Sequence, residues 1–231
     1  MDHGKGNSPQ IGSIRKYLGK SLKFYSLSAE SLPPAVFVFI LALGTISIFL
    51  PDKLLNDNWF YIIYNFINII LVFMASSVYL YACISEFSGK KYTVRDCMTR
   101  VLHTLPVLTA AYILVTVADI VGLALFIIPG LVLYIMLMFF SCFILDAGSG
   151  VIQSIRESRR ITTGRKMELF SIMLLLNLIL IVPLVIIIIV AVPQNDMRIM
   201  TFVTTFFISL LGLVQQRAIA LLYLDLKDKS T

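Results

Sequence analysis

The sequence predicts an all-α integral membrane protein with six transmembrane helices. Composition, the length of the apolar segments and the placement of the cations lead to this prediction. Of the 231 residues, 58% are hydrophobic and 14% are charged, whereas soluble domains carry about a quarter charged residues. A soluble fold of this size could not cover so much apolar side chain with polar surface. Several apolar windows also exceed the ~18 residues that cross a hydrocarbon core of ~30 Å.

Six apolar segments can be drawn along the chain, at 35–50, 59–84, 105–128, 131–145, 169–192 and 200–223. Each must be helical in lipid, because an exposed backbone group finds no hydrogen-bond partner there. The first and fourth segments are short, so they need a thinner bilayer or tilted neighbours. We therefore divide the chain into a basic tail at 1–30, a six-helix membrane domain at 31–226 and a second tail at 227–231.

Proline residues mark most of the segment boundaries. Pro33 and Pro34 open the first segment, where a missing backbone N–H costs little, and Pro51 closes it. The sequence IIPG at 127–130 predicts a tight turn between the third and fourth helices. Pro193 ends the fifth helix, and we expect Pro183, which lies inside it, to produce a kink.

Lysine and arginine residues alternate between the two sides of the predicted membrane. They gather before the first segment, between the second and third, between the fourth and fifth, and after the sixth, whereas the opposite connections hold only Lys53 and Arg198. Loops rich in lysine and arginine stay in the cytoplasm. The pattern therefore predicts a multi-pass protein of the cell (inner) membrane with both termini in the cytoplasm.

Three similar stretches precede the first, third and fifth segments, and they read SIRKY from Ser13, TVRDC from Thr93 and SIRES from Ser154. In each, apolar residues follow helical spacing while the cations face elsewhere. A helix with one apolar and one cationic face lies in the headgroup plane. There each Lys or Arg gains about 1 kcal/mol from an anionic leaflet. We expect an amphipathic interfacial helix before each of these segments, the alternative being chance recurrence of a short pattern.

A turn, an acidic residue with glycines and a basic stretch follow one another between positions 128 and 165, here Pro129, Gly130, Asp146, Ser158, Thr162, Gly164 and Arg165. This region resembles a bacterial and archaeal family of six-helix membrane proteins. The family includes the YciC-like proteins and the membrane domain of some glycerophosphoryl diester phosphodiesterases. The resemblance implies the six-helix fold. We expect no phosphodiesterase activity from the resemblance, because that activity belongs to a soluble domain for which these 231 residues leave no room.

Asp119 is the one acidic residue well inside a predicted span, and an intramembrane carboxylate is costly. One interpretation is a structural group that joins helices, with Asn65, Asn68 or Tyr61 as partners. The other is part of an ion or substrate path. Asn177 is the remaining member of this candidate polar site within the membrane.

Arg217 looks like an intramembrane cation. At ~1.5 Å per residue it lies ~26 Å from the start of the last segment, so it should reach the cytoplasmic interface. Asp146 and Glu86 lie at the same level and are its candidate partners. The same candidate surface for ion pairs or headgroup contacts includes the arginines of the loop between the fourth and fifth segments, Arg156, Arg159, Arg160 and Arg165.

Catalytic motifs are missing from the sequence. His3 and His103 are far apart and have no cysteine or carboxylate cluster beside them that would form a metal site, and neither a Walker loop nor a G-x-S-x-G elbow occurs. We expect no enzyme activity, no cofactor and no nucleic acid. The expected function is a membrane module that organises anionic lipids on the cytoplasmic side, a membrane protein partner or a second copy of the chain. The alternative is a small transporter or channel that uses Asp119.

Overall fold

The computed structural model describes residues 14–23, 25, 27, 31–49, 58–191 and 197–229. Within these ranges the chain is all-helical, as predicted. Its elements in chain order are α1 (Ile14–Leu22), α2 (Leu32–Thr45), the 3₁₀-helix η1 (Ile46–Phe49), α4 (Asn58–Phe87), α5 (Val94–Leu125), α6 (Ile127–Leu137), α7 (Phe140–Ala147), α8 (Val151–Thr162), α9 (Lys166–Ala191) and α10 (Met197–Asp228).

Five stretches of the described chain are long and apolar enough to cross a membrane: Trp59–Phe87, Val94–Ala124, Gly130–Ala147, Lys166–Ile189 and Arg198–Asp228. They coincide with five of the six predicted segments. The first predicted segment corresponds to α2, which has 14 residues and spans only about 21 Å at ~1.5 Å per residue. The membrane class is therefore supported by length and composition, and the sixth span is not confirmed.

Apolar side chains cover the outer faces of these helices. Ile62, Phe66 and Ile69 of α4 and Ile186 and Ile189 of α9 are all exposed. Monomeric soluble proteins rarely expose contiguous apolar surface on this scale. The exposed faces are those expected of helices that contact lipid.

Local chemistry sets several helix boundaries. Two prolines lie in the first turn of α2. At the start of α5 the Thr93 hydroxyl accepts from the Asp96 N–H (3.2 Å), and the Asp96 carboxylate accepts from the Thr93 N–H (3.0 Å), which is a capping box. Gly148 ends α7 with a φ of 69°, and Gly164 follows α8 with a φ of 84°. Glycine adopts this left-handed conformation without the steric cost that a Cβ would bring.

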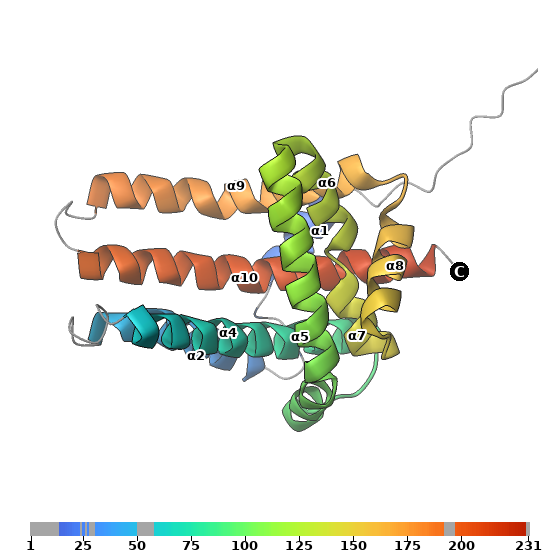
Figure 1. Cartoon of the computed structure of the whole chain (residues 1–231), viewed down its shortest axis with the longest axis horizontal. Coiled ribbons are helices and arrows are strands. Elements are labelled where there is room, and N and C mark those ends of the chain that lie inside the picture. The colour runs from blue at the N-terminus through green and yellow to red at the C-terminus, as the bar shows by residue number, and fades with distance from the viewer. Residues whose placement is uncertain are drawn as a thin grey trace, which may run out of the picture.

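The core of the molecule lies at one end of the long helices. Its fully buried side chains include Tyr79 and Ile84 near the end of α4, Leu169 at the start of α9 and Tyr223 near the end of α10. α10 packs against α4, α2, α9 and α1, so it is the central element. Figure 1 shows α7, α8 and the C-terminus gathered at this same end.

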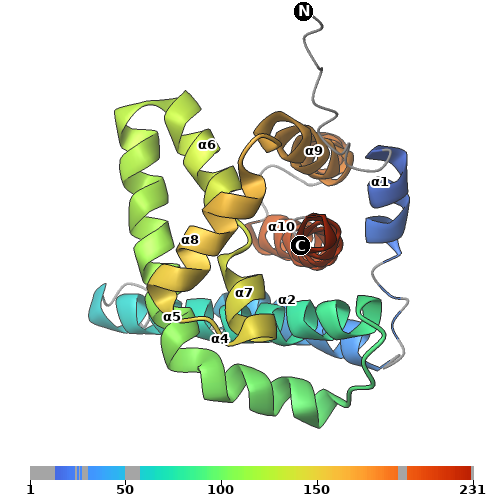
Figure 2. The same ribbon diagram turned by 90° about the vertical axis from the view of Figure 1, so that its right-hand side faces the viewer.

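α5 and α6 form a hairpin that runs across the long helices. In Figure 1 α9 and α10 extend along the long axis while α5 and α6 cross it, and Figure 2, with α9 and α10 seen end-on, shows the same crossing. Two glycines allow the close approach of α5 and α6. A Cβ on Gly122 would lie 3.2 Å from the Cα of Gly130, and a Cβ on Gly130 would lie 2.8 Å from the Cα of Leu123.

The packing of α6 places the hairpin near the first turn of α9. Leu131 and Ile135 of α6 line a small apolar cavity together with Met167 and Phe170 of α9. If α6 crossed the membrane antiparallel to α9, its first residues would lie beside the last residues of α9. They lie beside the first turn of α9 instead. The structure therefore does not confirm six spans, because the α5–α6 hairpin lies across α9 and α10, at the level where α9 begins.

The expected turn and interfacial helices also differ in detail. A single extended residue, Phe126, separates α5 from α6, so the sequence IIPG forms the first turn of α6 instead of a loop. Two of the three stretches expected to be interfacial form separate helices, α1 and α8. The stretch from Thr93 leads directly into α5 and is not a separate helix. α5 contains Pro106 and bends along its length (Figure 2). Most of the tail at 1–30, Pro51 and Pro193 lie outside the described residues.

We predict that the tip of the hairpin and the α8–α9 connection face the same side of the membrane. A cysteine at Phe126 or Thr163, both exposed, should react with an impermeant thiol reagent from one side of oriented vesicles. A cysteine at Arg198, also exposed, should react from the other side. The native thiols of Cys83, Cys97 and Cys142 are buried, so background labelling should be low. A hairpin that crosses the membrane would instead give Phe126 and Arg198 the same sidedness.

Candidate functional site

A break in the fourth predicted segment is bridged by a hydroxyl from α8. α6 ends at Leu137 and α7 begins at Phe140. At the break the Ser158 hydroxyl donates to the Met136 carbonyl (2.7 Å) and accepts from the Phe139 N–H (3.2 Å). Buried backbone groups without partners cost free energy comparable to a lost hydrogen bond. Ser158 therefore stabilises the break and fixes α8 against it.

Small hydroxyl residues form the inner face of α8. Ser154, Ser158 and Thr162 recur at every fourth position and are all buried, so they share one face of the helix. The Thr162 hydroxyl donates to the Ser158 carbonyl within α8 (3.0 Å). The motif residues that the sequence singled out at 158 and 162 thus have packing roles. Their spacing in the sequence is the signal that marks this face.

The arginines of this region have different environments. Arg156 and Arg159 are exposed on α8. Arg160 is also exposed and donates to Glu157 at 2.8 Å. In Arg165, the Nη1 atom is buried without a hydrogen-bond partner among the described residues. Only part of the candidate cationic surface therefore remains open to a ligand.

Asp146 joins three parts of the chain at the end of α7. Its carboxylate accepts from Lys90, in the loop after α4, at 3.1 Å, and from Lys227 of α10 at 2.6 Å. The Tyr223 hydroxyl donates to the same carboxylate at 3.1 Å. The Asp146 side chain is 6% exposed, whereas those of Lys90 and Lys227 are 59% and 43% exposed. Two ammonium groups thus share this one carboxylate.

Arg217 is buried and holds α1 onto α10. It is 5% exposed, its Nε donates to the Lys20 carbonyl of α1 at 2.9 Å, and its guanidinium lies over the Phe87 ring at 4.9 Å. Of its expected partners, Glu86 accepts from Tyr92 at 3.1 Å, and Asp146 is engaged as described above. Sequence reasoning missed the backbone acceptor on α1, because hydropathy carries no signal for it.

A basic groove runs along the first part of α5. It has a volume of about 540 Å³ and is lined by Arg95, Asp96, Thr99, Arg100, His103, Thr104 and Gly148. Asp96 is engaged in the helix cap, where its carboxylate accepts from both the N–H and the hydroxyl of Thr93. Arg100 donates from Nε to the Leu145 carbonyl at 2.9 Å. The groove is therefore lined by two guanidinium groups and an imidazole, and its one carboxylate, Asp96, is hydrogen-bonded to Thr93.

The asparagines of the expected polar site each use a different hydrogen-bond partner. The Asn65 amide donates to the Tyr61 carbonyl (2.8 Å), and the Asn68 amide donates to the carbonyl of residue 43 (2.9 Å). Asn177 accepts from Gln215 of α10 (2.9 Å), which joins α9 to α10. The Oδ1 atom of Asp119 is buried and has no hydrogen-bond partner among the described residues. Among the described residues, no hydrogen bond joins these four side chains to one another.

Fold and surface together define the class of this protein, an all-helical protein with several long apolar helices typical of a multi-pass membrane protein. Comparison of the chain with protein-family models, with curated proteins and with solved structures returned no match. In the part of the chain that the structure describes, no three His, Cys, Asp or Glu side chains are grouped in a way that could hold a metal ion.

We predict that Ser158→Ala destabilises the fold by about 1–3 kcal/mol, the cost of leaving buried backbone groups without a partner. The matched control is Ser154→Ala on the same face, because the Ser154 hydroxyl donates only to the Val151 carbonyl of its own helix. Thermal unfolding in detergent should show a clear decrease in Tm for Ser158→Ala and a much smaller one for the control. Equal shifts would mean that the break does not need this hydroxyl.

We predict that Asp146→Asn destabilises the fold by about 1–2 kcal/mol, since two charge-assisted hydrogen bonds are lost while water partly compensates the half-exposed lysines. The asparagine can still accept from Tyr223. The control is Asp225→Asn, which removes a pair with Lys229, one residue past the end of α10, and should cost about 0.5 kcal/mol or less. Chemical or thermal unfolding of both variants measures the difference, and a control as unstable as Asp146→Asn would refute a special role for Asp146.

Proposed function

We infer that the protein is a non-enzymatic membrane module that binds anionic lipid headgroups on the cytoplasmic side of the cell membrane. The basic groove on α5 carries this proposal. Arg95 and Arg100 bring guanidinium groups to an open groove with His103 beside them. Guanidinium groups match the charge and geometry of phosphate oxygens. Lys90, whose side chain is 59% exposed in the loop before α5, adds a further cation at the same end of the molecule.

The orientation follows from the charge pattern. The basic loops before α5 and around α8 lie at the same end of the molecule as the C-terminus (Figure 1). Because cationic loops remain in the cytoplasm, we assign this end, and both termini, to the cytoplasmic side. The charges of these loops do not decide the position of the α5–α6 hairpin. They agree with a hairpin that lies across the cytoplasmic interface and with one that crosses the membrane. The resemblance to YciC-like proteins stays a prediction, as does assembly with a membrane partner or a second copy.

The test of this function is lipid retention by the full chain. Purified protein should bind phosphatidylglycerol more tightly than phosphatidylcholine, as measured by native mass spectrometry during lipid titration in detergent. Arg95→Gln should weaken binding of phosphatidylglycerol about fivefold, since one cation near an anionic surface contributes about 1 kcal/mol. Arg198→Gln, which removes an exposed cation at the opposite end of the molecule, is the control. Equal affinity for the two lipids would refute the proposal.

A transporter or channel is the second candidate, and the buried Oδ1 of Asp119 without a partner among the described residues is the observation that favours it. Intramembrane carboxylates often lie on ion or proton pathways. Wild type and Asp119→Asn should be compared in a proteoliposome flux assay, with folding checked by thermal unfolding. We expect no specific flux from either. A wild-type flux that is lost in a normally folded Asp119→Asn variant would establish the transport function.

A further inference from the structure

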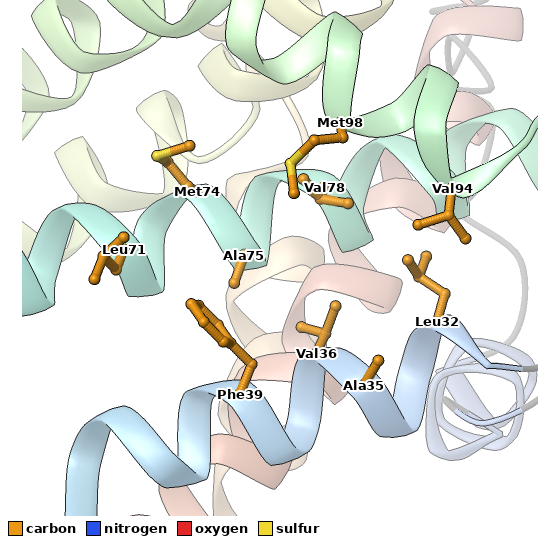
Figure 3. A pocket seen from close by; sticks show the side chains of 10 residues that line it. All are labelled: Leu32, Ala35, Val36, Phe39, Leu71, Met74, Ala75, Val78, Val94 and Met98. Atoms are coloured by element: carbon orange, nitrogen blue, oxygen red, sulfur yellow. The ribbon is translucent and has the colours of Figure 1, made fainter. Parts of the chain in front are cut away.

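An apolar groove of about 350 Å³ lies between α2, α4 and the first turns of α5. Figure 3 shows its ten lining side chains, all of them apolar. Leu32 and Val94 lie at one end, Phe39 and Leu71 lie at the other, and Met98 reaches over the middle. The stretch of α2 from Leu32 to Phe39 is about 10 Å long at ~1.5 Å per residue. The groove is thus a narrow channel parallel to two apolar helices.

The walls and the rim of the groove differ in exposure. Leu32, Val36 and Val78 are buried, whereas Phe39 and Met98 at the rim are exposed. The groove therefore opens to the surroundings of the protein. Ordered water is a poor occupant, because a bound water needs two to four polar partners. A helix is a poor occupant too, since it is 10–12 Å across with its side chains. A flexible hydrocarbon chain fits both the shape and the chemistry.

Charge indicates which hydrocarbon enters. At the end formed by Leu32 and Val94, the chain carries Lys91 and Arg95, which flank Val94 in sequence and are both exposed. The opposite end, at Phe39 and Leu71, leads toward the middle of α2 and α4. A phospholipid with its phosphate at the cationic end and one chain along the groove satisfies both features, and the anionic headgroup adds attraction to the two cations.

We propose that this groove holds one acyl chain of an anionic phospholipid from the surrounding leaflet. The inference rests on the proposed function and extends it, because it gives the bound lipid a place for its chain. The cations of the basic groove hold the headgroup on one face of α5, whereas Val94 and Met98 direct the chain to another face. The lipid would be retained as a specific ligand and not as bulk solvent.

The experiment is photo-crosslinking of the full chain in vesicles. The probe is phosphatidylglycerol with a diazirine on one acyl chain, and labelled residues are identified by peptide mass spectrometry. We expect adducts to concentrate on groove residues such as Leu71 and Met74, and Ala75→Phe, which fills the groove, should lower them at least fivefold. Ile67→Phe, on an exposed part of α4 outside the groove, is the matched control and should leave the pattern unchanged.

A second variant covers the case in which Ala75→Phe fails to fold. Ala35→Leu narrows the groove from the α2 side and should also lower the adducts. Three results overturn the inference. The first is labelling spread evenly over the exposed faces of α4 and α9, and the second is equal labelling of the groove by a phosphatidylcholine that carries the same diazirine. The third is a crosslink that joins two copies of the chain through the groove.

The experiments distinguish an error in the acyl-chain inference from an error in the proposed lipid-binding function. Both groove variants leave Arg95 and Arg100 in place. Groove labelling that is absent while wild type still prefers phosphatidylglycerol in the native mass spectrum overturns the inference alone. Loss of that preference in wild type overturns the proposed function and, with it, the anionic ligand assigned to the groove.

Discussion

The carboxylate of Asp146 joins the ends of three segments that hydropathy treats as independent. It fixes the loop after α4, the end of α7 and the end of α10 at one point. In a membrane the apolar faces of helices gain little by leaving lipid for one another, so packing and polar contacts must provide much of the specificity. The buried core lies at this same end of the molecule, and the basic groove on α5 and the docking site of α8 lie beside it.

The orientation of the α5–α6 hairpin depends on contacts around α7, at the same end of the molecule. Arg100 of α5 donates to the last turn of α7, Gly148 ends α7 in the left-handed conformation, and Ser158 closes the break between α6 and α7. These contacts explain why the fourth apolar segment does not continue as a straight helix. The break redirects α6 so that it packs across α9, and it leaves the first part of α5 open on both the basic and the apolar side.

Much of the fold could be predicted from the sequence, because lipid leaves a chain few alternatives to a helix. The segments predicted at 59–84, 169–192 and 200–223 lie within about three residues of the ends of α4 and α9 and within about five residues of the ends of α10. The direction of the hairpin could not be predicted, since it depends on the close approach of Gly122 and Gly130 and on a hydroxyl from α8. The Asp146 contacts were missed for a similar reason, because their partners are 56 and 81 positions away and leave no local pattern.

The hydrogen bond between Arg217 and the Lys20 carbonyl joins residues that are 197 positions apart in the sequence, so it cannot form until α10 has been synthesised. α1 packs on α9 and α10, which are synthesised long after it. α1 therefore has no docking site until α9 and α10 have been made. Contacts of this sequence separation form slowly because the chain between them must first be ordered.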